Sequence, residues 1–313
     1  MDFELDEDQL QLRDAAAEVL AKECPPAFLR GVIADTRDPT ELWATLAGLD
    51  WPGLALPTEL GGVGSSMVEL AIVLEQLGYV GDPTPLLATT SQLVPVVQAC
   101  GDAEQQRRFL GPVATGAITG TLALAGADGR WDPAAPPVEA GRTGEGWRLA
   151  GTAHVVVDGD RADEIAVLAG TVDGTQAFVV PATAVSIRRI PTFDPTLHVA
   201  DVTFDDATVS DDRRLAGEPA HRGFERALEV AATGLAAAMV GACQRVLDMV
   251  VEYVTGREQF GVPIGSFQAV KHKAVDMYIA VERARADPAR RPHHRRGGRS
   301  PNGRRLDGEG GGR

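Results

Sequence analysis

The sequence has few aromatic residues and few cysteines. Aromatic residues make up 5% of the 313 residues, so Ala, Val and Leu must fill most of the core. The three cysteines, Cys24, Cys100 and Cys243, form no CxxC pair and no even-numbered framework. Structural disulfides and a metal site such as zinc are therefore not expected, and a reducing, cytoplasmic environment fits best.

Long apolar runs and net positive charge are also missing. Charged residues interrupt every apolar run of about 18 residues, so no membrane span is predicted. The N-terminus, MDFELDEDQLQLRD, is acidic and amphipathic, unlike a signal peptide. The net charge of −14 argues against a nucleic-acid partner, because phosphate binding needs clustered Lys and Arg. A chain of 313 residues is long enough for two or three subdomains.

The first part of the chain has helical periodicity. Apolar positions recur on one face after an acidic start, and Gly and Pro clusters separate the segments. Residues 1–118 are expected to form a helical domain. The predicted helices begin near Leu5 and Asp38 and cover Met67 to Gly78, Leu86 to Ala99 and Asp102 to Leu110, with Gly78 as a C-cap.

From about Thr119 the period changes to that of strands. Short β-rich runs alternate with Gly, Pro and Asp clusters, which is typical of a small antiparallel β domain. Residues 119–218 are expected to form this domain. Its predicted strands are Thr121 to Ala125, Trp147 to Leu149, His154 to Val157, Ile165 to Ala169, Gln176 to Val180 and Ala200 to Phe204.

Helical patterning returns at Gly223. The segment to about Thr255 is apolar around much of its circumference, which indicates burial against several neighbours. A second long helix is predicted from Ser266 to Arg285. Residues 219–286 are thus expected to form a partial C-terminal helical domain. The predicted fold class is α+β, in the order helices, β domain, helices.

The tail from Asp287 to Arg313 differs from the rest. It carries eight Arg against three acidic residues and only one large aliphatic residue, Leu306. Such a segment buries too little apolar surface to offset its ordering entropy, so residues 287–313 are expected to be disordered. Either the tail binds an anionic partner, or it is a frameshifted end that replaces a lost helical segment. We favour the second, because the preceding helix needs neighbours on its apolar side.

The segment from Gly256 to Tyr278 carries the chemistry. From the residues alone it is a loop between two long helices, with Phe260 and Ile264 filling the core. Alternatively, Arg257, which stands beside Gln259 and Phe260, binds a phosphate and an aromatic ring of a ligand.

The same segment resembles the signature of the acyl-CoA dehydrogenases, R-x-Q-F-G-x-P-I-x-x-F-Q-A followed by H-x-x-A-D-M. It has Arg257, Gln259-Phe260-Gly261, Pro263-Ile264, Phe267-Gln268-Ala269, His272 and Asp276-Met277. Further stretches resemble the family, so the likeness covers about residues 1–286. The resemblance implies an FAD cofactor, an acyl-CoA substrate and a loop that reaches the FAD of a neighbouring subunit. It places Arg257 at the pyrophosphate and Gln259, Phe260 and Gln268 near the ADP portion.

The catalytic base of the family has no evident counterpart here. In many members it is a Glu in a later helical region, where this chain has its tail. In others the base lies on the helix that here follows Phe224, at a position that aligns near Ala231. Glu229 is two residues earlier and about 200° around the helix, so it faces elsewhere and is expected to be a solvated charge. The catalytic residue is therefore unknown.

The flavin cradle also departs from the family. Ala125 stands where a hydroxyl is usual, Val155 where Trp is usual, and Val157 at a second hydroxyl position. Side-chain donors to the flavin ring are thus lost, although backbone N–H groups remain. His154 is interpreted as an ordinary strand residue rather than a catalytic one.

Three hypotheses follow from the resemblance. The chain is an FAD-dependent acyl-CoA dehydrogenase subunit in a dimer or tetramer, or a non-catalytic partner that completes the FAD site of a catalytic relative. The third is a defective product that folds poorly. Some actinobacterial members are hetero-oligomers of two related chains, several acting on steroid side-chain thioesters, and the intact loop beside a degraded cradle resembles such a partner. The acyl chain itself is not specified by the sequence.

Overall fold

The N-terminal part of the computed structural model, which describes residues 5–217 and 220–286, is helical. The predicted tail, residues 287–313, lies outside the described residues. Four longer helices form most of this part: α1 (Glu7–Glu23), α3 (Thr40–Gly48), α4 (Met67–Val80) and α7 (Ala103–Ala114). The shorter α2 (Pro26–Ile33), α5 (Leu86–Ala88) and α6 (Val94–Cys100) complete it.

Side-chain caps explain where three of these helices begin. Asp6, Ser66 and Asp102 cap α1, α4 and α7, and in each case the Gln or Glu three residues later bonds back to the cap. Such reciprocal pairs satisfy backbone N–H groups that have no partner within the helix. The sequence prediction put these starts within a few residues of the observed ones.

The end of α4 differs from the prediction. Gly81, with φ +74°, is the left-handed C-cap, and Gly78 lies inside the helix. A β-carbon at Gly78 would overlap the carbonyl oxygen of Ala238 on the helix α8 (Ala220–Gly256). The glycine at position 78 therefore permits close helix approach, whereas the glycine at position 81 supplies the positive φ of the cap.

The predicted helix Leu86 to Ala99 is present but interrupted. A π turn, Thr89–Leu93, separates α5 from α6. Thr90 and Ser91 donate their hydroxyl hydrogens to the carbonyl oxygens of Leu86 and Leu87, at 2.8 and 2.6 Å. The turn is fully buried and lies between strand β1 (Gly120–Ala123) and α8.

The middle of the chain forms one seven-stranded sheet in the order β1-β4-β2-β3-β7-β6, with β5 also paired to β4. The sheet is mostly antiparallel, as predicted, but β1 and β2 pair with β4 in parallel. This is possible because intervening segments connect β1 and β2 to β4, whereas a tight hairpin forces an antiparallel pair. The strands not yet given are β2 (Val138–Thr143), β3 (Gly146–Val157), β4 (Glu164–Thr171), β5 (Gly174–Pro181), β6 (Ser186–Arg189) and β7 (Val199–Val209).

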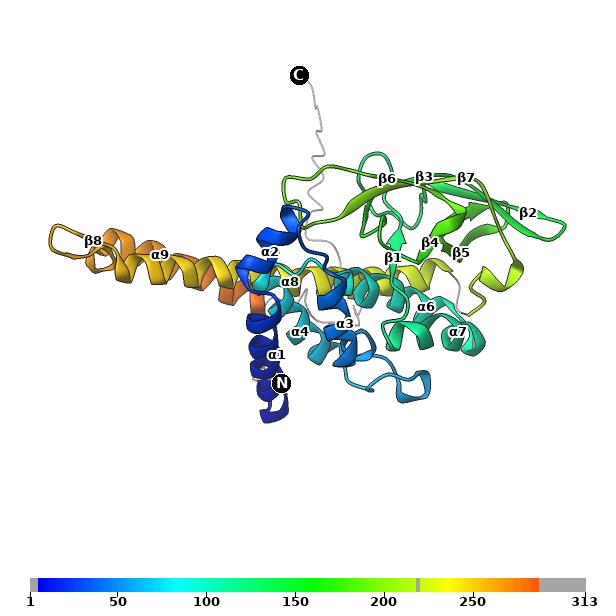
Figure 1. The fold of residues 1–313 in the computed structure, drawn as a ribbon. Coiled ribbons are helices and arrows are strands. Elements are labelled where there is room, and N and C mark those ends of the chain that lie inside the picture. The colour runs from blue at the N-terminus through cyan, green and yellow to red at the C-terminus, as the bar shows by residue number, and fades with distance from the viewer. Residues whose placement is uncertain (1–4, 218–219, 287–313) are drawn as a thin grey trace, which may run out of the picture.

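Two long helices follow the sheet. Figure 1 shows α8 running beneath the sheet and then, with α9 (Gln268–Ala286), extending beyond the rest of the chain as a hairpin. Its tip is a two-stranded ribbon of β8 (Glu258–Gln259) and β9 (Val262–Pro263). The order of helices, sheet and helices is the predicted one.

Helix α8 forms contacts along much of its length. It lies against α4, the π turn and α6 in its first part, and against α9 near its end. Among the described residues it is the one helix long and apolar enough to cross a membrane. Its buried face, which includes Phe224, Ala227, Ala237 and Val240, is that of a core helix, so the length and composition of α8 are weak evidence for a span.

Candidate functional site

The loop between α8 and α9 turns sharply at its tip. Phe260 has φ +55° and Gly261 has φ +80°, and this pair closes the ribbon of β8 and β9. The amide of Ile264 donates to the carbonyl oxygen of Arg257 at 2.8 Å, which ties the two ends of the ribbon together. Positive φ is costly for a phenylalanine, so this conformation is imposed by the surrounding turn.

The four predicted cofactor-binding residues all lie in this hairpin and are exposed. Arg257, Gln259 and Phe260 are on or beside the ribbon, and Gln268 begins α9. The Phe260 side chain is 94% exposed, so it does not fill the core as the simpler interpretation of the sequence held. Its ring meets that of Phe267 edge-on, with ring centroids 6.1 Å apart. The hairpin therefore exposes a guanidinium, two side-chain amides and an aromatic face to another molecule.

The hairpin helices also carry a large apolar surface that the described residues leave uncovered. Patches of this size on a soluble protein usually mark an interface. The exposed side chains on α8 and α9 are Leu235, Met239, Val246, Met249, Val251, Tyr253, Val275, Tyr278 and Ile279.

The position where some members of the resembled family carry their base is apolar. Ala231 is 5% exposed and faces the interior, while Glu229 is exposed, as the helical spacing predicted. A β-carbon at Gly234, one turn further along, would lie 2.6 Å from Cβ of Ser91. This face of α8 therefore looks onto the π turn and presents no carboxylate there.

The predicted flavin cradle is built from β1, β3 and the segment after β1. The amide of His154 donates to the carbonyl oxygen of Ala125 at 2.9 Å, which holds the two strand segments together. Val155 has φ +53°, at a bulge in β3. A β-branched residue in the left-handed region is strained, and such strain often lies at functional sites. Apolar side chains stand at both positions expected to contact the flavin ring, Val155 and Val157.

His154 has a structural role. Its Nδ1 lies 2.9 Å from Asp201 Oδ1, and Arg188 binds the other oxygen of the same carboxylate. These contacts tie β3, β6 and β7 together. The arrangement agrees with the interpretation of His154 as a strand residue.

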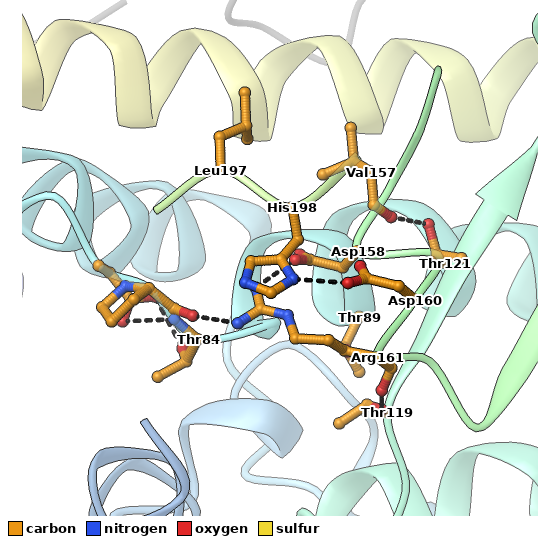
Figure 2. A network of polar contacts seen from close by, with 12 residues as sticks. Thr84, Thr89, Thr119, Thr121, Val157, Asp158, Asp160, Arg161, Leu197 and His198 are labelled. Carbon is orange, nitrogen blue, oxygen red and sulfur yellow. Dashed lines mark hydrogen bonds and ion pairs between the residues drawn. The ribbon is translucent and has the colours of Figure 1, made fainter. Parts of the chain in front are cut away.

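Sequence reasoning missed a buried polar network beside Val157, shown in Figure 2. Arg161 binds the carboxylate of Asp158 and the carbonyl oxygen of Pro83, so it joins the sheet to the loop after α4. His198 Nδ1 lies 2.8 Å from Asp160 Oδ2. The charged run Asp158-Gly159-Asp160-Arg161 after a strand was the available signal, but its partners come from distant segments.

Burial shifts the pKa values of the acidic residues in and near this network. It raises the pKa of Asp82 to about 7, although hydrogen bonds from Thr84 oppose the shift. Burial also raises the pKa of Asp158 against the opposing charge of Arg161. For Asp160, burial acts in the same direction but is outweighed by the hydrogen bond and charge of His198, so its pKa is lowered.

A surface pocket of about 470 Å³ opens between α6, α7 and the start of α8. Its walls include Pro95, Gln98, Arg226, Ala227 and Val230. Pro95 lies three residues after Gln92 of the π turn, and Val230 immediately precedes Ala231. Ala227, which also lines the pocket, lies four residues before Ala231, so the pocket opens about one helical turn from the position at which a family base would stand.

Two family models match the chain. The model described as acyl-CoA dehydrogenase, N-terminal domain, matches residues 6–117, and the C-terminal domain model of the same family matches residues 222–290. Together they cover more than half of the chain.

Comparison with known proteins and solved structures gives the same family. Acyl-CoA dehydrogenase IpdE2 of Mycobacterium tuberculosis is 32% identical, over 90% of this chain and 74% of the relative. The ChsE4-ChsE5 complex of Mycobacterium tuberculosis superposes with a TM-score of 0.81 at 30% identity, over 92% of this chain and 81% of that chain. A Tcur3481-Tcur3483 steroid ACAD variant gives 0.78 at 35% identity, over 88% and 74%. This chain belongs to the acyl-CoA dehydrogenase family.

Proposed function

We propose that the chain is a subunit of an FAD-dependent dehydrogenase that introduces an α,β double bond into an acyl-CoA thioester. Its own contribution is the hairpin between α8 and α9, which completes the flavin site of a neighbouring subunit. One observation carries the proposal: Arg257, Gln259, Phe260 and Gln268 are exposed together on a hairpin that extends beyond the rest of the chain.

The chemistry of these residues fits a dinucleotide that arrives from outside. A guanidinium binds a diphosphate through paired hydrogen bonds, which suits Arg257 to the pyrophosphate. The amides of Gln259 and Gln268 and the open face of Phe260 suit the ADP portion. When bound, FAD supplies the hydride acceptor of the reaction. The hairpin residues bind and orient it and transfer no proton themselves.

The partner is another acyl-CoA dehydrogenase chain, either a second copy or a related sequence. The exposed apolar side chains of α8 and α9, such as Met239, Met249 and Tyr278, support this, because they continue from the hairpin toward the core. Two structural relatives are described as a two-chain complex and a steroid ACAD, which favours a related chain and a steroid or fatty acyl substrate. We place the assembly in the cytoplasm and keep the domain limits 1–118, 119–218 and 219–286.

A second candidate is a partner subunit that does not catalyse. Three positions favour it: Ala125 and Val157 offer no hydroxyl to a flavin ring, and Ala231 offers no carboxylate. In this case only the neighbour carries out the reaction, and the present chain supplies the hairpin and the interface.

The visible absorbance of flavin tests these alternatives. The chain is purified alone and after co-expression with a family member from the same genome. Flavin bands in the chain alone support the catalytic subunit, and bands that require the partner support the hairpin donor. Flavin that binds the partner equally well without this chain would contradict both.

A further inference from the structure

We infer that the exposed face of α8 docks a second copy of this chain, through antiparallel packing of α8 against α8 around a two-fold axis. The inference deepens the proposed function, because it names the neighbouring chain, and it rests on the proposed function for the role of that neighbour. It starts from a row of exposed residues on α8. This row, the α8 stripe, consists of Leu235, Met239, Ala242, Val246, Met249 and Tyr253.

The α8 stripe has the spacing of a coiled-coil seam. Its members follow one another at intervals of alternately four and three residues, which is the a/d repeat of a heptad. The stripe runs for about five turns, or about 27 Å, on the side of α8 opposite the buried Val240 and Leu247. The exposed apolar residues of α9 lie within 275–279, little more than one turn. A surface as long and narrow as the α8 stripe fits another helix.

The sizes of the stripe residues favour the antiparallel register. In a two-fold pair, a residue that contacts a given position of the other copy is contacted by that position in return. An axis between Val246 and Met249 pairs each of these residues with the other, and it places Tyr253 opposite Ala242. Large and small side chains thus interdigitate. A parallel pair instead places Ala242 against Ala242 and leaves a gap there.

Charges at the edge of the α8 stripe agree with this register. Arg245 and Glu252 lie seven residues apart and therefore on the same flank of the stripe. The Arg245 guanidinium lies over the ring of Tyr79 on α4, 5.5 Å from its centroid, which holds it at this flank. The two-fold axis brings Arg245 of each copy level with Glu252 of the other. Two pairs of opposite charges result, whereas a parallel pair does not bring these residues together.

A second copy fits the α8 stripe better than the end of the same chain does. Residues 287–313 carry eight Arg and only one large aliphatic side chain, Leu306. This composition offers too few apolar side chains to cover five turns of helix. The second copy supplies the same apolar repeat and the complementary charges.

The register also has a consequence for the hairpin. It places Met239 level with Gly256 of the second copy, where α8 ends and the ribbon begins. The ribbon of the second copy therefore continues along the first half of α8, the half that lies beneath the sheet in Figure 1. Each hairpin then reaches the body of the other copy, as the proposed function requires of a neighbour.

Sedimentation equilibrium of the full chain, at concentrations from about 1 to about 100 μM, tests the docking surface. A monomer–dimer equilibrium is expected. Met249→Glu places a carboxylate in each of two central layers, and the dimer is expected to dissociate about tenfold or more readily. Val172→Glu, at a fully exposed position between β4 and β5, is the control and is expected to change nothing. Circular dichroism of both variants verifies that the helices are retained.

Charge reversal tests the register. Arg245→Glu and Glu252→Arg each place like charges opposite one another, and each is expected to weaken self-association about fivefold or more. An equimolar mixture of the two variants is expected to dimerise as the wild type does, because the mixed dimer restores both pairs of opposite charges. A variant that merely damages the fold would not be rescued in this way.

Cross-linking of cysteines provides a distance measurement. Cys243 is exposed, whereas Cys24 and Cys100 are buried. In the antiparallel register Cys243 is level with Val250 of the second copy. Val250→Cys is therefore expected to give a covalent dimer with a short bismaleimide. The wild type and Val251→Cys, which lies off the α8 stripe, are expected to give none.

Three results would overturn the inference. One is a chain that stays monomeric at about 100 μM, including one that associates only with a co-expressed family member. Another is a dimer that Met249→Glu leaves intact. The third is a dimer in which the charge mixture is not rescued or Val250→Cys is not cross-linked. None of these measurements depends on flavin, whose absorbance tests the proposed function separately.

Discussion

The carbonyl oxygen of Glu75 on α4 lies where a β-carbon at residue 241 of α8 would be, and residue 241 is glycine. The same pair of helices repeats the device with Gly78 and Ala238. Two glycines, one on each helix, thus allow the backbones of α4 and α8 to touch. This contact fixes α8, from which the hairpin extends.

Substitution at this contact is expected to destabilise the fold. Gly241→Ala forces the two backbones apart and is expected to lower the free energy of unfolding by about 1–3 kcal/mol. Urea unfolding followed by circular dichroism measures the change. Gly111 in α7 is the control, because a β-carbon there meets nothing within 4 Å. Gly111→Ala is expected to stabilise by about 0.5–1 kcal/mol, and equal effects of both variants would contradict the account.

The carboxyl group of the half-buried Asp82 is expected to make stability depend on pH. Its pKa is raised to about 7 from 3.8, so the folded state holds the proton more tightly than the unfolded state. The free energy of unfolding therefore falls as the pH rises from about 4 to about 7. Asp82→Asn removes this dependence and is expected to reduce the loss between pH 5 and pH 8 by on the order of 2 kcal/mol.

Thermal and urea unfolding at pH 5 and pH 8 measure this difference. Asp205→Asn, at an exposed carboxylate, is the matched control and is expected to leave the pH dependence unchanged. An Asp82→Asn variant with the wild-type dependence would show that another group is responsible.

Removing one partner of the ion pair between Arg161 and Asp158 is expected to destabilise the fold. Arg161→Met leaves the buried Asp158 carboxylate without its cation, and the free energy of unfolding is expected to fall by about 3–5 kcal/mol. The double variant Asp158→Asn/Arg161→Met is expected to recover part of the loss, because no unpaired charge remains. A single variant that costs less than about 1 kcal/mol would place the ion pair among the weak surface pairs.

Restoring hydroxyl groups to the flavin cradle is expected to improve flavin binding by this chain. Ala125→Ser together with Val157→Thr adds two donors at the positions that the family resemblance marks. Two neutral hydrogen bonds of about 1 kcal/mol each predict FAD binding tighter by about tenfold or more. Fluorescence titration of FAD measures it, with the fully exposed Val172→Thr as control. Unchanged affinity would mean that these positions do not face the flavin.

The sequence predicted the architecture well because helix caps and periodicity are local signals. The predicted helix starts near Leu5, Met67 and Asp102 are confirmed, and the structure adds the caps Asp6, Ser66 and Asp102, which bond to groups three residues away. Gly78 was assigned to a cap because a glycine near a helix end resembles one. Its actual reason, the approach of Ala238, depends on a helix that lies far along the chain.

The site was predictable only in part, because some of its contacts join segments that lie far apart in the sequence. The hairpin residues form one continuous segment, so a motif identifies them together. The network of Asp158, Arg161 and His198 joins three segments, and the π turn at Gln92 is defined by hydrogen bonding rather than by a pattern of residue types. The parallel pairing of β1 with β4 likewise depends on sheet topology rather than on the strands' own sequences.

The affinity of the assembly for FAD tests the donated hairpin most directly. The substitution Arg257→Ala is made in this chain only. The dissociation constant of FAD is measured for the co-purified complex with wild-type chain, with Arg257→Ala, and with Lys273→Ala, a basic residue on α9 that is not among the proposed cofactor-binding residues. The dissociation constant is expected to rise about tenfold or more for Arg257→Ala, because a pair of charge-assisted hydrogen bonds is lost, and to stay unchanged for Lys273→Ala. FAD binding by the Arg257→Ala complex at wild-type affinity would contradict it.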